Sequence, residues 1–255
     1  MTAGAPVVAS EPAWSPDGAK LACTVYRDDM PAIAVINRDG SGERRPTDPA
    51  APDGHPAWSP DGSQIAFSRI MGPHDNRIHV MSADGEDVRT LTGRQASEFA
   101  PAWHPSGRTL LFSDADTHTL VKFDLADERR ESIAAAAWFA EWSPDGRRIA
   151  ARIGTDVYVM DGDGDNLRRL TQHPAHDSEP SWSPDGRQLV FTSDRDGITQ
   201  IYRIDADGGN VRRLVAGRSL DTNPAWWGPS KLAVTSRERR ATMWGWLRTR
   251  AIATR

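Results

Sequence analysis

Acidic and imidazole side chains recur at fixed distances before prolines along this chain. An acidic residue lies three places before the proline in four segments, and a second polar residue lies directly before a proline in four. The first set comprises Asp53, Glu98, Asp177 and Asp221, and the second comprises Glu11, His55, Glu179 and Asn223. Arranged around one axis, these side chains predict a mostly acidic funnel that suits a cationic peptide, an amine-bearing ligand or a divalent cation. The alternative interpretation is that the aspartates cap their own turns and accept hydrogen bonds from loop amides.

One segment departs from this pattern. It reads Ala137-Trp138-Phe139-Ala140-Glu141-Trp142, and Glu141 stands where the other segments have alanine or serine. Two aromatic rings beside a carboxylate predict a ligand-binding wall at the funnel, formed by Trp138, Phe139 and Glu141. The same rings also fit an interpretation in which they plug the channel or pack within a shortened unit.

The chain has few of the patterns that signal catalysis or metal binding. His173 and His176 form a His-x-x-His pattern in a loop, and they are weak candidates for a zinc or nickel site because such a site needs three or more convergent ligands. The segment 161–166 resembles the start of a calcium loop but lacks the required glycine and glutamate, so we predict a hairpin turn there. Nucleophile-elbow, zinc-helix and phosphate-loop motifs are absent from the sequence. We therefore expect no catalytic residue and no cofactor, with a divalent cation left open.

Charge and cysteine content exclude several classes of protein. The net charge is −4, so the basic footprint of a nucleic-acid-binding protein is missing. The single cysteine, Cys23, excludes an internal disulfide framework, and its alignment with phenylalanines in other segments predicts a buried thiol.

Membrane insertion is not expected either. No stretch approaches the ~20 apolar residues of a membrane helix. The N-terminal residues show no signal-peptide pattern, so the chain as written is expected in the cytoplasm. A periplasmic or extracellular location is the alternative if a further segment precedes it.

A five-residue turn recurs along the sequence and predicts the fold. Trp-Ser-Pro-Asp-Gly begins at Trp14, Trp58, Trp142 and Trp182, and altered copies begin at Trp103 and Trp226. The spacing of about 40–45 residues is that of a four-stranded propeller blade. Such units bury their faces only by stacking on one another around a ring.

Each unit is expected to contain four short strands. The sequence therefore predicts an all-β, six-bladed propeller of four-stranded antiparallel blades, forming one domain over 1–255. The repeats begin near Pro12, Pro56, Pro101, Ala140, Pro180 and Pro224. After Ser236 the pattern stops, so the last blade needs strands from elsewhere. We favour the N-terminal segment Pro6–Ala9 as its outer strand over the C-terminal tail 241–255.

The quoted repeats resemble the TolB-like propeller repeat, a WD-like pattern of Pro-x-Trp-Ser-Pro-Asp-Gly followed by Ile-Ala-Phe, Ile-Tyr-Val-Met, Asp-Gly and Arg-Arg-Leu-Thr. The unit 179–215 follows it almost throughout, and the resemblance covers about 12–236. It implies the fold but leaves function open, because similar repeats occur in periplasmic translocation proteins, in propellers preceding serine peptidases and in polysaccharide lyases.

Three functional hypotheses follow. The favoured one is a soluble, monomeric, non-catalytic scaffold that binds a protein or peptide at the funnel face. The second is a lyase or hydrolase, with or without a metal, that uses a His–carboxylate site in the funnel built from His55, Glu141, His176 and Glu179. The third is a detached propeller module of a larger exported protein or serine peptidase.

Overall fold

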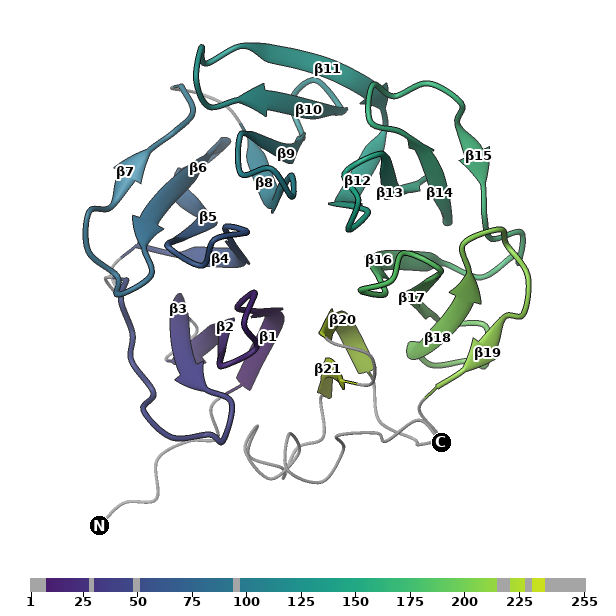
Figure 1. Ribbon diagram of the computed structural model, residues 1–255, viewed down its shortest axis with the longest axis horizontal. Helices are drawn as coiled ribbons and strands as arrows, with labels where there is room; N and C mark the ends of the chain where they lie inside the picture. The colour runs from purple at the N-terminus through teal and green to yellow at the C-terminus, as the bar shows by residue number, and fades with distance from the viewer. Residues whose placement is uncertain are drawn as a thin grey trace.

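The computed structural model describes residues 8–27, 30–47, 51–93, 97–214, 221–227 and 231–236, and these form only strands and connecting turns. Six antiparallel sheets surround a central axis like the blades of a propeller (Figure 1). Within each sheet the strands follow one another in chain order from the axis outward. The prediction of an all-β propeller is therefore confirmed.

The strand bounds repeat from sheet to sheet. The first sheet contains β1 (Val8–Trp14), β2 (Lys20–Arg27) and β3 (Met30–Asn37). The second contains β4 (Asp53–Trp58), β5 (Gln64–Gly72), β6 (Asp75–Ser82) and β7 (Arg89–Thr90). The third contains β8 (Glu98–Trp103), β9 (Thr109–Asp114), β10 (Thr119–Asp124) and β11 (Arg130–Ala135). The fourth contains β12 (Ala137–Trp142), β13 (Arg148–Ile153), β14 (Asp156–Asp161) and β15 (Arg168–Arg169). The fifth contains β16 (Asp177–Trp182), β17 (Gln188–Ser193), β18 (Gln200–Asp205) and β19 (Arg212–Arg213), and the last contains β20 (Asp221–Trp227) and β21 (Lys231–Ser236).

The prediction of six four-stranded blades is wrong for the described residues. Four blades have four strands, the first has three, and β20–β21 is a two-stranded pair, which makes five blades and a pair. In the first blade the described outer segment forms no strand, and its one β-bridge to β3 joins Val35 and Arg44. The unit that contains β20 lacks the Asp-Gly turn that follows the third strand in the first, second, fourth and fifth units, and its sequence after Ser236 lies outside the described residues.

The preferred closure of the ring by the N-terminal segment is also wrong. Val8 and Ala9 belong to β1, the innermost strand of the first blade, where they pair with Tyr26 and Val25 of β2. Because β2 is eight residues long, it offers these two residues ladder partners in their own blade. Pro6, Val7 and the tail 241–255 lie outside the described residues. The ring meets itself where β1 packs beside β20.

A hydrogen-bonded turn joins the first two strands of each of the first five units. In the first unit the Asp17 carboxylate accepts hydrogen bonds from the Ser15 hydroxyl at 2.6 Å and the Ala19 amide at 2.9 Å, and these bonds lower the pKa of Asp17. Gly18 adopts a φ of 63°, a conformation that costs glycine little. The same serine–aspartate bond of 2.6 Å recurs at Ser59, Ser143 and Ser183.

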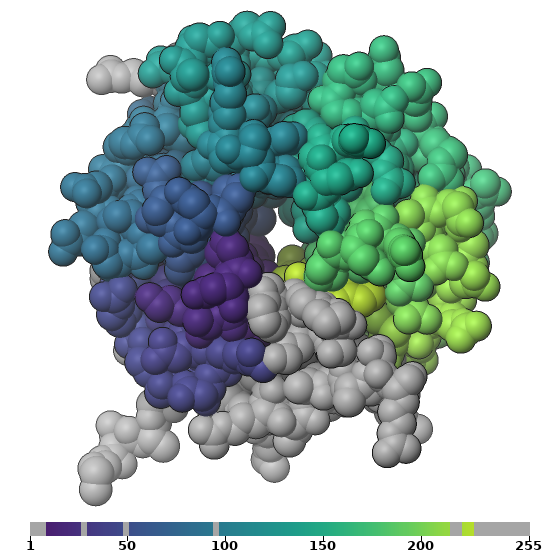
Figure 2. All heavy atoms as spheres, in the orientation of Figure 1, coloured from purple at the N-terminus to yellow at the C-terminus, as the bar shows by residue number. Residues whose placement is uncertain are grey.

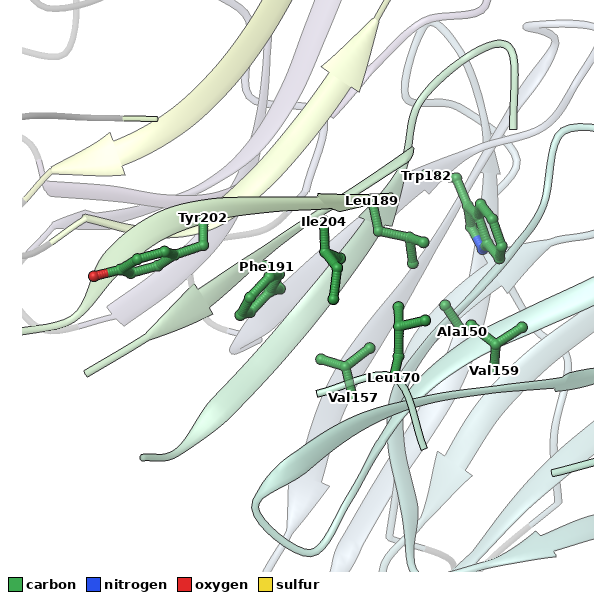
Figure 3. Packing of buried hydrophobic residues seen from close by; sticks show 9 residues of the cluster. All are labelled: Ala150, Val157, Val159, Leu170, Trp182, Leu189, Phe191, Tyr202 and Ile204. Atoms are coloured by element: carbon green, nitrogen blue, oxygen red, sulfur yellow. The ribbon is translucent and has the colours of Figure 1, made fainter. Parts of the chain in front are cut away.

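The hydrophobic core consists of side-chain layers between neighbouring blades. Figure 3 shows one of them, in which Trp182, Leu189, Phe191, Tyr202 and Ile204 of the fifth blade face the fourth blade. Their partners from the fourth blade are Ala150, Val157, Val159 and Leu170. The tryptophan indoles also bond across the boundaries: Trp58 and Trp103 donate to the carbonyls of Ala13 and Ala57, each at 3.1 Å. Cys23 lies in such a layer, as predicted, and burial raises the pKa of its thiol to about 12.

This layer predicts the effect of a matched pair of truncations. Leu189 is fully buried between the blades, whereas Leu167 is 51% exposed in the turn between β14 and β15. Leu189→Ala should lower the free energy of unfolding by about 2–5 kcal/mol through lost burial and a residual cavity. Leu167→Ala should change it by about 0.5 kcal/mol or less. Urea denaturation measures both, and equal effects of the two substitutions would contradict interblade packing as the source of stability.

Candidate functional site

A channel runs along the axis of the ring, and Figure 2 shows its opening at the centre of the molecule. It encloses about 540 Å³ and is lined by β1, β4, β8, β12, β16 and β20, together with the turns that follow several of them. Its walls are mainly prolines, alanines and tryptophans. Against this apolar lining, a small number of charged and aromatic side chains define the chemistry of the channel.

Each of the six innermost strands contains a bulge at the same place. The strand register shifts there, and the residue before the recurring proline, or before Ala140, adopts a φ of 48–54°. These left-handed residues are Glu11, His55, Ala100, Phe139, Glu179 and Asn223. Proline has no amide to donate to a ladder, so a bulge is a favourable place for it. The bulge places this residue in the lining of the channel.

Two of the left-handed residues are glutamates that link neighbouring sheets. Glu11 Oε2 accepts hydrogen bonds from the Thr24 hydroxyl at 2.6 Å and the His55 amide at 2.7 Å, and Glu11 Oε1 lies 3.3 Å from His55 Nε2. Glu179 Oε2 accepts from the Asn223 amide at 2.7 Å. Burial raises the pKa of Glu179, although the Asn223 amide lowers it, and the charge of Glu11 adds to the increase.

Aromatic rings gather at the mouth on β4, β8 and β12 and in the loop before β10. Phe99 and Trp138 stack with centroids 5.5 Å apart, and Phe139 meets Phe99 edge-on at 5.9 Å. His55 lies 6.0 Å from Phe99 and 6.2 Å from Phe139, while His118 contacts the edge of Trp138 at 6.0 Å. We call these five residues the aromatic cluster. Each is half-buried or exposed, so the cluster is accessible at the surface.

Arg152 is the guanidinium beside this cluster. Its Cζ lies 5.7 Å from the centroid of Phe139, within the range of a cation–π contact. Burial lowers its pKa, and the nearby charge of Glu179 acts in the opposite direction. The mouth therefore presents two glutamates, Glu11 and Glu179, next to aromatic rings and one guanidinium.

The acidic residues three places before the prolines do not line the channel. Asp53, Glu98, Asp177 and Asp221 are fully buried. Arg69 bonds Asp53 at 2.7 Å, Arg195 bonds Asp177 at 3.0 Å, and Arg130 pairs with Glu98. The three arginines also lie 5.3 Å from the rings of Phe67, Phe191 and Phe112.

The expected acidic funnel is thus incomplete for a physical reason. Side chains alternate along a strand until the bulge adds a residue and changes which side faces the axis. Asp53 lies before the bulge, directly opposite Arg69 in the register, whereas His55 lies at the bulge and faces the channel. Burial of a carboxylate requires such a partner.

Glu141 occupies the throat of the channel, below the mouth. It is half-buried and lines the cavity at the position of Ala13, Ala57, Ala102, Ser181 and Ala225. Its carboxylate accepts hydrogen bonds from the Ser181 hydroxyl and the Trp182 amide. Burial outweighs these bonds and raises the pKa of Glu141 to about 7.

The histidines proposed as weak metal ligands do not converge. His173 and His176 are both exposed; the His173 ring accepts a hydrogen bond from the Ala175 amide, and the backbone amide of His176 donates to Asp194. Over the described ranges, no three His, Cys, Asp or Glu side chains lie in a group that could hold a metal ion. The segment 161–166 forms the expected hairpin turn, closed by a bond from the Gly164 amide to the Asp161 carbonyl.

The sequence did not predict that Phe99 and Arg152 lie at the mouth. It also did not predict the contact between His118 and Trp138. Phe99 aligns with Gly54, Ser178 and Thr222, so an aromatic residue at an otherwise small or polar position was the available signal. Arg152 occupies a register position at which the other four blades and the β20–β21 pair have threonine or serine, such as Thr24, Ser68 and Thr192.

The arrangement defines a class of protein: a β-propeller with an axial channel and a mouth lined by side chains that differ from blade to blade. In the part of the chain that is described, no helix has the length and apolar character needed to cross a bilayer. A family model described as the TolB beta propeller domain matches residues 2–138 and again 74–245. The chain belongs to this family.

Individual relatives share parts of the chain or its fold. The Tol-Pal system protein TolB of Bordetella pertussis is 47% identical over 47 residues, which are 18% of this chain and 11% of that protein. TolB from Acinetobacter baumannii superposes with a TM-score of 0.76 at 22% identity over 87% of this chain and 57% of that one. The tricorn protease superposes with a TM-score of 0.72 at 15% identity over 91% of this chain and 24% of that one. The chain therefore spans only part of these relatives, and the two structural matches show the fold alone.

The raised pKa of Glu141 predicts a pH-dependent effect of Glu141→Gln. Because the folded pKa of about 7 exceeds the ordinary value of 4.5, ionisation of Glu141 costs stability above pH 4.5 and the cost becomes constant above pH 7. The stability of the glutamine variant relative to the wild type should therefore increase as pH rises from 4.5 to 7, by up to about 3 kcal/mol. Chemical denaturation at several pH values tests this, and a difference independent of pH would contradict it.

The buried ion pairs predict a second contrast. Asp177→Asn leaves the largely buried Arg195 without its carboxylate and should cost about 3–5 kcal/mol of unfolding free energy. Asp87→Asn changes an exposed aspartate in a left-handed turn position that asparagine also tolerates, so it should be nearly neutral. Thermal melts of the two variants compare their melting temperatures. An unchanged melting temperature for Asp177→Asn would refute a structural role of the ion pair between Asp177 and Arg195.

Proposed function

We propose that this chain is a binding module that holds a protein or peptide partner over the mouth of its channel. The observation that carries the proposal is the aromatic cluster, because accessible stacked rings at a channel mouth are the kind of surface that anchors partners. The side chains there differ from blade to blade, whereas the turns and interblade layers repeat.

Exposed apolar residues extend this surface over the first two blades. The hairpin β2–β3 has strands of eight residues and β5–β6 has strands of nine and eight, against six in the corresponding hairpins of the next three blades. Tyr26, Met30, Ile70 and Met71 lie near the tips of the two long hairpins and are 36–52% exposed. These tips lie at the same end of the strands as the start of β1 and β4. A partner that covers the aromatic cluster would also reach them.

The comparisons support a protein partner and bear on the compartment. The name of the Bordetella pertussis relative places that protein in a Tol-Pal system, which favours partner binding and an exported location over the cytoplasmic one for this chain. The partial coverage of the relatives agrees with a module of a larger protein.

A capture experiment with matched variants tests the binding function. The immobilised chain is exposed to an extract of its own source, and the captured protein is identified, purified and titrated. Trp138→Ala and His118→Ala should each weaken its binding tenfold or more, equivalent to about 1.4 kcal/mol. His118 is exposed, so its substitution leaves the buried layers intact.

Leu167→Ala is the control, because Leu167 is exposed in a turn at the opposite end of the strands. Equal binding by all three variants would place the partner elsewhere and overturn the proposed surface.

One observation favours a second candidate, a lyase or hydrolase. Glu11 and His55 form a His–carboxylate pair with 3.3 Å between Oε1 and Nε2 at the channel mouth, the geometry of a general base oriented by an acid. Such an enzyme should lose most of its turnover on His55→Gln, and a turnover that survives this substitution would rule out His55 as the general base.

A further inference from the structure

The throat of the channel has aliphatic walls on every described strand. The layer that contains Glu141 otherwise consists of small residues, and prolines lie above and below it. The small residues are Ala13, Ala57, Ala102, Ser181 and Ala225. The prolines above are Pro12, Pro56, Pro101, Pro180 and Pro224, and those below are Pro16, Pro60, Pro105 and Pro144. A linear hydrocarbon chain along the axis would contact apolar surface throughout this layer.

Glu141 interrupts these walls with a carboxylate that the described fold leaves without a cation. No ion pair within the described ranges involves Glu141. The Ser181 hydroxyl and the Trp182 amide use two of the roughly four acceptor positions of a carboxylate. The remaining positions can accept hydrogen bonds from a group in the cavity.

The propeller fold itself does not require a carboxylate at this position. Five equivalent strands form the same bulge and carry the same tryptophan with alanine or serine in place of Glu141. Burial of a carboxylate in low-polarity surroundings carries a cost that a paired cation offsets. A ligand is the natural source of that cation.

The charged residues at the mouth also favour a cationic ligand. A molecule that enters past the left-handed residues meets Glu11 and Glu179 before it reaches Glu141. Arg152 lies over Phe139, so the acidic groups outnumber the guanidinium along the path. This field favours cations over anions.

We propose that the throat is a binding site for a primary ammonium group on a linear aliphatic stem, as in a lysine side chain, with Glu141 as its counter-ion. The stem lies against the alanines and prolines, and the ammonium lies at the carboxylate. An ammonium suits this site better than a guanidinium, because a carboxylate that already accepts two hydrogen bonds cannot offer both oxygens freely to a planar fork. This inference rests on the proposed function and names the group that the partner inserts into the channel.

The test uses two probes that differ only in the terminal ammonium group. Nα-acetyl-lysine methylamide carries the ammonium, and Nα-acetyl-norleucine methylamide carries a similar stem without it. Binding is followed by NMR through the indole signals of the channel tryptophans, such as Trp103 and Trp142. A probe of this size is expected to bind with a Kd on the order of 1 mM.

The wild type should bind the lysine probe at least tenfold more tightly than the norleucine probe. Glu141→Gln, of nearly equal shape, and Glu141→Ala, which copies four equivalent strands, should each remove that preference. Glu86→Gln alters an exposed glutamate in the turn before β7 and should leave it unchanged. Indole spectra without probe report whether each variant is folded.

Equal binding of the two probes, or an undiminished preference in the glutamine variant, would overturn the proposal. Absence of binding by the wild type up to about 50 mM would overturn it as well, since that is far above the expected Kd. Each of these outcomes is separable from the proposed function, because partner capture that depends on Trp138 and His118 would remain.

Discussion

The left-handed residue in each innermost strand is the constraint on which both the channel and the blades depend. It is followed by proline in five strands and by Ala140 in the remaining one, so the position tolerates loss of the proline but keeps its backbone conformation. A non-glycine residue in this conformation costs about 1 kcal/mol or more, and six of them represent a substantial local cost. The hydrogen bonds that the amides of His55 and Asn223 donate to the carboxylates of Glu11 and Glu179 help to offset it.

The bulge also separates two chemical environments within a few residues. Before it, carboxylates such as Asp53 and Asp177 point into the blade and pair with arginines that cover phenylalanine rings. At and after it, side chains face the axis, where there is room for Glu179 and Glu141 to keep unused acceptor positions. Acidic residues two positions apart in the sequence therefore have different roles, one in holding strands together and the other in lining a cavity.

The propeller class could be predicted from the sequence because the turn and its spacing repeat, and each copy has a local physical cause. The placement of the acids could not be predicted in the same way. A change of one residue in strand register reverses which side chains face the channel, and nothing in Asp53 or Glu98 marks the bulge that follows. The irregular segment around Glu141 was a better guide, since a charged residue at a repeatedly small position signals a local exception.

The closure of the ring was mispredicted for a related reason. Apolar residues such as Val8 and Ala9 fit an inner or an outer strand equally well, and only the length of β2 decides between them. The aromatic cluster could not be predicted from local sequence, because its residues meet only in the folded chain. Phe99 and His118 come from the innermost strand and a loop of the third blade, and Trp138 comes from the fourth blade.

The boundaries between blades have a consequence for how such a molecule changes over evolutionary time. Neighbouring sheets meet through side chains, and in the described residues only the bridge between Asn76 and Ser97 joins the backbone of two blades in the manner of a strand pair. One face of each unit is therefore complementary to the opposite face of any similar unit. Duplication or deletion of a whole unit creates a new boundary of the same kind, so the number of blades is limited by the angle at which they pack and not by the pairing of particular strands. Sequence divergence is then free to concentrate on the few axial positions that no boundary needs.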